Sequence, residues 1–198
     1  PQASITLPTN LTTHSGAVLD LEGKALTVTG NYGMYSSSRV KMVQAATLFT
    51  VNGNYDSNPT NDIGDTWFTN GILDIKGNFT ATNSCCGQSF RAVGSHLTRF
   101  SGTGAQSIAV YYPTSGQTVF QNVEVTNVSA SGVATGSGLY ILGGFTNTGR
   151  LTVNTGHTVT VQGVLTLGAS SNTHIAGTLN RASCSAAAGA TFFGLSCP

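Results

Sequence analysis

The chain has seven carboxylates that could do chemistry, and only three of them cluster: Asp56, Asp62 and Asp65 lie within ten residues. Oxygen ligands at that density could hold a calcium ion. The spacing begins like an EF-hand loop, but Asn61 stands where that loop needs glycine and Trp67 where it needs a bidentate glutamate. We retain Asp56, Asp62 and Asp65 as a weak calcium candidate and favour a solvated loop between two structural repeats.

Catalytic signatures are sparse. Glycoside hydrolysis usually needs two carboxylates about 5–10 Å apart, which Asp62 with Asp65, or Asp20 with Glu22, could supply only in principle. No G-x-S-x-G nucleophile elbow occurs. The histidines are far apart in sequence and none is spaced for a metal, so each is expected to be a surface or turn residue; they are His14, His96, His157 and His174. We therefore predict no catalytic centre and no cofactor, with a carbohydrate-active enzyme as the weakest alternative.

The composition indicates an exported protein with few charges. Charged residues are 8% of the chain and the net charge is +1, so hydroxyl and amide side chains carry most of the polarity. The Lys and Arg residues are scattered, which argues against a nucleic-acid partner, and no apolar stretch reaches the ~18–20 residues of a membrane span. Four cysteines without metal-type spacing favour an oxidising compartment. We expect an extracellular or cell-surface location, and the start at Pro1-Gln2-Ala3-Ser4 fits a mature end.

The adjacent cysteines Cys85 and Cys86 set the disulfide prediction. Their Cα atoms are about 3.8 Å apart across a trans peptide, which is short of the usual ~4.4–6.8 Å for a disulfide. A bond between Cys184 and Cys197 would leave two neighbouring thiols free. We therefore predict that Cys85 and Cys86 each bond to one of Cys184 and Cys197, within the chain or between subunits, so that the C-terminal tail becomes a staple.

A sequence repeat predicts the strands that carry these residues. A short strand of alternating apolar and polar residues ends in Gly-Asn-aromatic at residues 26–32, 49–55 and 73–79, in steps of 23 and 24 residues, and looser copies follow. Apolar residues at i and i+2 are typical of half-buried strands, and helical periodicity is nearly absent. Glycine there permits a turn. The predicted structural corners are Gly30, Asn31, Gly53, Asn54, Gly77 and Asn78.

A period of about 20–25 residues predicts one coil of a parallel β-solenoid per repeat, right-handed by the usual rule for parallel connections. Val28, Val51 and Ile75 should then stack in one continuous core, at the ~4.8 Å spacing of strands in a sheet. An antiparallel sandwich is the alternative fold, because strands every 8–12 residues also describe it. The recurrence of one specific corner favours the solenoid.

The segment Gly94 to Ile108 resembles a repeat of large secreted bacterial surface proteins, in which G-x-H-x-x-x-F-x-G-x-G-x-Q-x-I precedes an N-V-x-V strand. Asn122-Val123-Glu124-Val125 matches that strand. Together with the earlier copies, the resemblance covers most of residues 20–165. It implies a β-solenoid in a cell-surface or fibre setting and carries no catalytic residues.

These observations predict a single domain, residues 1–198, with 1–15 as a cap or donated strand, 16–183 as coils and 184–198 as a tail. The expected function is a self-associating extracellular structural protein, a surface or filament subunit. The alternative is an adhesive module that binds glycan or another surface. That alternative needs exposed aromatic residues, and one member of each pair should point outward where the pair lies in a strand; the pairs are Trp67-Phe68, Tyr111-Tyr112 and Phe192-Phe193.

Overall fold

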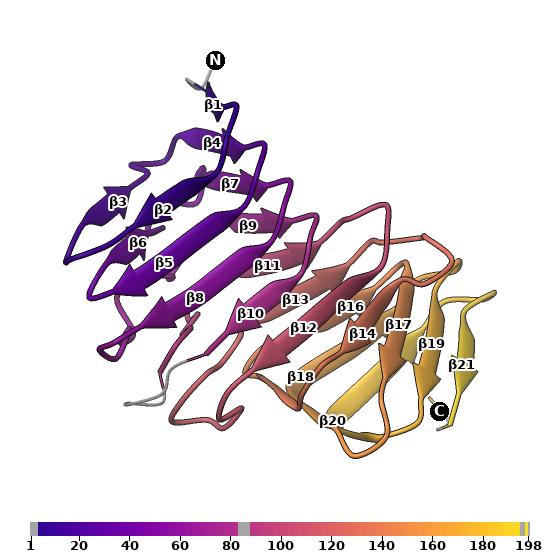
Figure 1. The fold of residues 1–198 in the computed structure, drawn as a ribbon. Helices are drawn as coiled ribbons and strands as arrows, with labels where there is room; N and C mark the ends of the chain where they lie inside the picture. Colours follow the sequence, from indigo (N-terminus) through magenta and orange to yellow (C-terminus); the bar gives the residue numbers. More distant parts are fainter. Residues whose placement is uncertain (1–3, 83–87, 195–196, 198) are drawn as a thin grey trace.

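The computed structural model describes residues 4–82, 88–194 and 197, and every regular element in them is a β-strand. Strands pair in parallel with strands from the turns before and after them, so the chain winds through about eight turns of a β-solenoid (Figure 1). The predicted fold is therefore confirmed, and the antiparallel sandwich is excluded for this part of the chain. The repeated Gly-Asn corners join the first two faces of the solenoid, which we call face A and face B.

Face A is the longer of the two main sheets. Its typical strand has four residues that alternate between half-buried and buried, as the two-residue period of a strand requires. Two long strands bend into it at its C-terminal end. Its strands are β1 (Ser4–Leu7), β4 (Ala25–Val28), β7 (Leu48–Val51), β9 (Ile72–Ile75), β11 (Leu97–Phe100), β13 (Asn122–Val125), β16 (Phe145–Asn147) and the second halves of β18 (Thr158–Leu167) and β20 (Thr178–Ala186).

Face B contributes one strand to each turn, and all its pairings are also parallel. Its strands are β2 (Leu11–Thr13), β5 (Tyr32–Ser36), β8 (Tyr55–Pro59), β10 (Phe79–Ala81), β12 (Gln106–Val110), β14 (Val133–Thr135), β17 (Arg150–Val153), β19 (Asn172–Ile175) and β21 (Thr191–Phe193).

Face C, the third face, changes character along the molecule. It starts as two short strands, β3 (Val18–Asp20) and β6 (Arg39–Lys41), which pair with each other. Isolated bridges through Phe68 and Phe120 then replace strands in the middle turns. Strands return with β15 (Leu139–Ile141) and the first halves of β18 and β20. Loops therefore interrupt this face in the middle turns.

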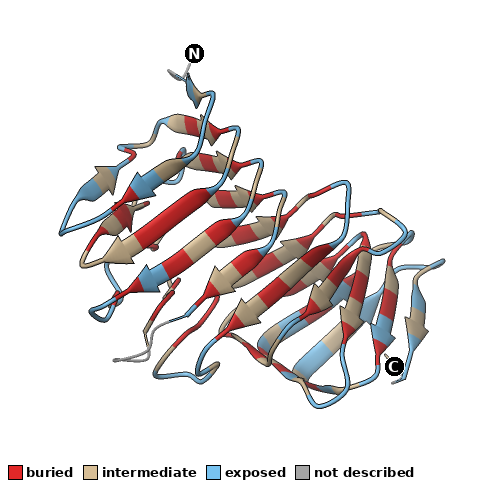
Figure 2. Cartoon of the chain, in the orientation of Figure 1, coloured by how far each residue is buried: buried red, intermediate tan, exposed pale blue. Residues whose placement is uncertain are grey.

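Inward side chains form ladders along the solenoid axis. Buried and less buried residues alternate along the strands (Figure 2). Val28 pairs in register with Val51, and Val51 with Ile75, and all three are fully buried. The rings of Tyr32 and Tyr55 stand 5.2 Å apart on face B. The predicted single core is confirmed, because Val125, Ile141 and Val161 belong to the same buried cluster.

Candidate functional site

The structure does not bring the three clustered acids together. Asp56 lies on face B, where its Oδ2 accepts a hydrogen bond from the Tyr35 hydroxyl at 2.9 Å. Asp62 accepts a bond from a backbone N–H one coil later, at 3.2 Å, and Asp65 forms an ion pair with Arg91. Within the described ranges, no group of three His, Cys, Asp or Glu side chains could hold a metal ion. Each acid instead has its own partner from a neighbouring coil.

Cys184 is bonded to Cys197, with 5.6 Å between their Cα atoms. The predicted pairing of these two cysteines with Cys85 and Cys86 is therefore wrong. Cys85 and Cys86 themselves lie outside the described residues. The physical reason is distance along the axis: Cys184 is in β20, at the last turn, whereas Ala81 ends a strand of the fourth turn. A disulfide does hold the C-terminal tail, as expected, but it joins the tail to β20 of the last turn.

The repeated corners form a hydrogen-bonded ladder of asparagines. The Oδ1 atom of Asn10 accepts a bond from the backbone N–H of Asn31, at 2.8 Å. In the same way, the Oδ1 atom of Asn31 accepts a bond from the backbone N–H of Asn54, at 2.7 Å, and the Oδ1 atom of Asn54 accepts one from the backbone N–H of Asn78, at 2.8 Å. Gly53 has no left-handed backbone, contrary to the expected turn role; a Cβ there would overlap Asn31 and the carbonyl of the preceding coil. Close stacking of coils explains the glycine.

A polar groove lies on face B beside this ladder, with a volume of about 330 Å³. We call it the asparagine groove. One side is a row of three ladder residues, Asn10, Asn31 and Asn54. The other side is the row two residues further along the chain, where Thr12, Gly33 and Asp56 pair in register, with Tyr35 beside them; Tyr32 also lines the groove. Asn10, Thr12, Gly33 and Tyr35 are not among the site residues predicted from the sequence. A usable signal was present, because Gly33 and Tyr35 are two residues apart and therefore project from the same side of β5.

The Tyr35 ring is fixed in its place beside the groove. It stacks on His14 from the previous coil, with 5.0 Å between ring centroids, and its hydroxyl bonds to Asp56 of the next coil. A Cβ on Gly33 would overlap the Tyr35 ring, so the glycine makes room for it. Partial burial, together with the Asp56 carboxylate, raises the pKa of Tyr35. The Tyr35 hydroxyl therefore stays protonated and donates to Asp56.

The prediction of one outward ring applied to pairs within a strand, and Phe192-Phe193 in β21 confirms it, because Phe193 is exposed and Phe192 packs against the core. The other two pairs lie outside strands. Tyr111 and Tyr112 are both about half exposed, with ring centroids 4.2 Å apart. They follow β12, and the left-handed backbone of Tyr112 (φ 51°) breaks the strand alternation on which the prediction rested. In Trp67-Phe68, Phe68 is fully buried and Trp67 is half-buried against the core.

His96 is fully buried, so its predicted surface position is wrong. Its ring packs against Phe68 and Phe90, and its Nδ1 lies 2.9 Å from the carbonyl oxygen of Asn70. Its Nε2 has no hydrogen-bond partner among the described residues. Burial lowers the pKa of His96 to about 4, with the Asn70 contact acting in the opposite direction. The ring is therefore neutral at pH 7.

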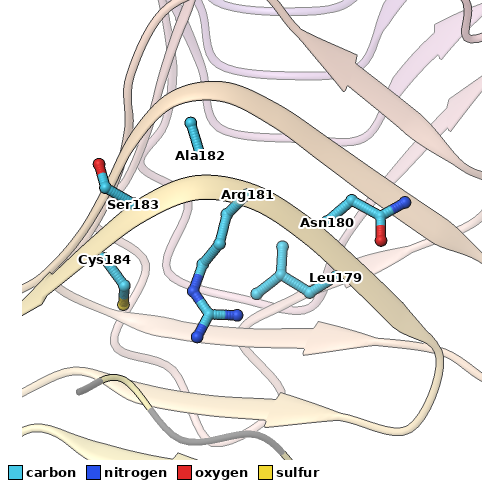
Figure 3. Close-up of a pocket in the computed structure, with 6 residues that line it drawn as sticks. All are labelled: Leu179, Asn180, Arg181, Ala182, Ser183 and Cys184. Atoms are coloured by element: carbon cyan, nitrogen blue, oxygen red, sulfur yellow. The ribbon is translucent and has the colours of Figure 1, made fainter.

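A second hollow, of about 460 Å³, lies where β20 bends between face C and face A (Figure 3). Leu179, Arg181 and Cys184 project to the same side of the bend. Arg181 pairs in register with Val161, so a charged residue takes the last place of an otherwise apolar inward row. The lining contains no carboxylate and no histidine, which leaves it without a general acid or base.

The first coil, at the N-terminal end of the solenoid, exposes two large apolar side chains. Ile5 is 53% exposed and Val18 is 50% exposed. Both belong to strands that have a partner on one side only in the described part of the chain. Leu7 and Leu11 pack against the core from the same coil and stay partly exposed.

No protein-family model, curated protein or solved structure matches this chain. Among the described residues, no helix is long and apolar enough to cross a membrane. The candidate sites are therefore the asparagine groove and the N-terminal end, both identified from geometry alone.

Proposed function

We propose that this chain is an extracellular structural protein, a β-solenoid rod that self-associates through its N-terminal end. The observation that carries the proposal is the unpaired edge of the first coil. Within the described residues, β1, β2 and β3 each pair with a single strand. A strand edge with unpaired N–H and C=O groups is a template for pairing with another chain.

The side chains at this end suit association with a second copy. Ile5 and Val18 are each about half exposed, and β1 and β2 contain no charged residue. Covering apolar side chains stabilises an interface by roughly 25 cal/mol per Å² of buried surface. No charge on β1 or β2 opposes the approach of an identical end, and Asp20 on β3 forms an ion pair with Lys41 of the next coil at 2.7 Å.

The C-terminal end is built differently, which supports a contact that involves the N-terminal end alone. A contact there would cover Arg181 at the end of its inward row and would meet the Cys184–Cys197 linkage. We therefore propose contact between two N-terminal ends. Such a contact is isologous and closes as a dimer, which favours a surface subunit over an open filament. The disulfide and the resemblance to secreted bacterial surface proteins support an extracellular setting.

Light scattering after size-exclusion chromatography tests this proposal across a concentration series. We expect a dimer for the unmodified chain and a monomer for Ile5→Lys or Val18→Lys, since each substitution places a charge in the contact. Val128→Lys is the matched control, because Val128 is 79% exposed and distant in sequence from the first coil. A monomeric unmodified chain, or dimers that persist in both N-terminal variants, would overturn the proposal.

A further inference from the structure

We infer that the asparagine groove binds an uncharged, hydroxyl-rich glycan chain. This inference goes beyond the structural role and does not depend on it. The groove crosses the first three coils on face B, and its two sides carry complementary hydrogen-bonding groups.

One side of the groove presents a row of fixed donors. The Oδ1 atoms of Asn31 and Asn54 each accept a backbone N–H from the next coil, which sets the orientation of both amides. Their Nδ2 groups have no protein acceptor within the described residues, and both side chains are exposed. Because the two residues occupy equivalent places in successive coils, the donors repeat at about 4.8 Å along the axis.

The other side presents acceptors. Asp56 uses Oδ2 for the Tyr35 hydroxyl, and its Oδ1 has no protein donor in the described structure. Thr12 adds an exposed hydroxyl to the same side. A ligand that satisfies both sides must both accept and donate hydrogen bonds at short intervals. Hydroxyl groups do both, and sugar chains carry them on every ring.

Other ligand classes fit the groove less well. A peptide that adds a strand needs an unpaired sheet edge, but β5 lies between β2 and β8 in the sheet. Asp56 is the one ionised group among the lining residues, and it would repel phosphates, nucleic acids and acidic sugars. The chemistry therefore favours a neutral glycan.

Isothermal titration calorimetry with defined hexasaccharides tests the inference. The probes are cellohexaose, chitohexaose and mannohexaose, with hexagalacturonate as the acidic comparison. We expect at least one neutral hexasaccharide to bind and hexagalacturonate not to bind. The double variant Asn31→Asp/Asn54→Asp should bind that sugar about tenfold more weakly or worse, because Asp keeps the Oδ acceptor for the backbone but lacks the amide donor.

Asn78→Asp is the matched control. Asn78 plays the same ladder role, accepting the backbone N–H of Ser107 at 2.9 Å, but it does not line the groove. The Asn78→Asp variant should bind the neutral hexasaccharide with the same affinity as the unmodified chain. The Ile5→Lys variant should do so too, and this result would distinguish glycan binding in the groove from association through the N-terminal end. Failure of all neutral hexasaccharides to bind at millimolar concentrations would overturn the inference. Equal affinity of the double variant would do the same.

Discussion

The coils before residue 121 and those after it fill the same solenoid in different ways. The earlier coils bury eight of the nine largest buried rings, and the later coils bury one, Phe145. The coil from Leu73 to Thr98 has 25 residues, whereas the coil from Leu165 to Cys184 has 19. Larger side chains need a wider cross-section, because protein interiors are close-packed. A wider cross-section takes a longer chain to enclose.

The later coils fill their interior mainly with aliphatic side chains, and polar side chains are buried in both groups of coils. The Nδ2 of Asn147 donates to the Thr173 hydroxyl at 2.8 Å, with both side chains buried. The Oδ1 of Asn147 accepts the backbone N–H of Gly149 at 3.0 Å. Buried amides of this kind are stable only when their groups are satisfied. One strand register therefore accommodates either a wide interior filled with aromatic rings or a narrower interior filled mainly with aliphatic side chains.

The largest expected effect is the insertion of a charge into the earlier core. Val51→Asp should abolish the cooperative unfolding transition, because it buries an unpaired carboxylate in a fully enclosed position. Thr27→Asp is the control, since Thr27 faces outward from the neighbouring strand β4. Thermal melting followed by circular dichroism checks both. A folded Val51→Asp variant that melts like Thr27→Asp would contradict the assigned register.

A matched pair of ring deletions compares the two interiors directly. Phe79→Ala should cost about 3–5 kcal/mol of unfolding free energy. Phe145→Ala should cost less, by about 0.5–1.5 kcal/mol, because Phe79 packs against the rings of Tyr55, Phe90 and Phe120. Urea denaturation of both variants supplies the two free energies. Equal losses would show that aromatic packing adds nothing specific to the earlier coils.

Acid should destabilise the earlier coils first, through His96. The folded-state pKa of about 4 lies below the ordinary 6.5, so the unfolded chain binds the proton more tightly. The contribution of neutral His96 to the free energy of unfolding is therefore fully present above about pH 6.5. It falls by roughly 3 kcal/mol as the pH drops to about 4. Urea titrations across this range measure the slope. His96→Leu should flatten it, and an unchanged slope in that variant would assign the acid sensitivity to other groups.

The smallest effect is expected at the end of the later coils. Replacing both Cys184 and Cys197 by Ser removes a crosslink that spans 13 residues, and such loops contribute about 2–3 kcal/mol. Because each turn contacts mainly its neighbours, faster hydrogen exchange should appear in β20 and β21 and not in β4 or β7. Exchange that rises equally throughout would show that the solenoid unfolds as one unit.

The fold and the axial register could be predicted from the sequence. The two-residue alternation and the 23- and 24-residue steps were enough to stack Val28, Val51 and Ile75, because both patterns are local and repeat. The same steps placed Asn31, Asn54 and Asn78 in equivalent corners. What the asparagines do there was within reach of sequence reasoning, since an amide at a repeated corner has the next coil as its nearest partner.

The contacts that depend on loop paths and on the two ends of the solenoid could not be predicted from the sequence. The partner of Cys184, the burial of His96 and the outward placing of both Tyr111 and Tyr112 each follow from where an irregular segment meets the solenoid. No periodic signal reports such positions. The asparagine groove likewise needed Tyr35 and Asp56 from different coils, whose 2.9 Å contact exists only once the coils stack.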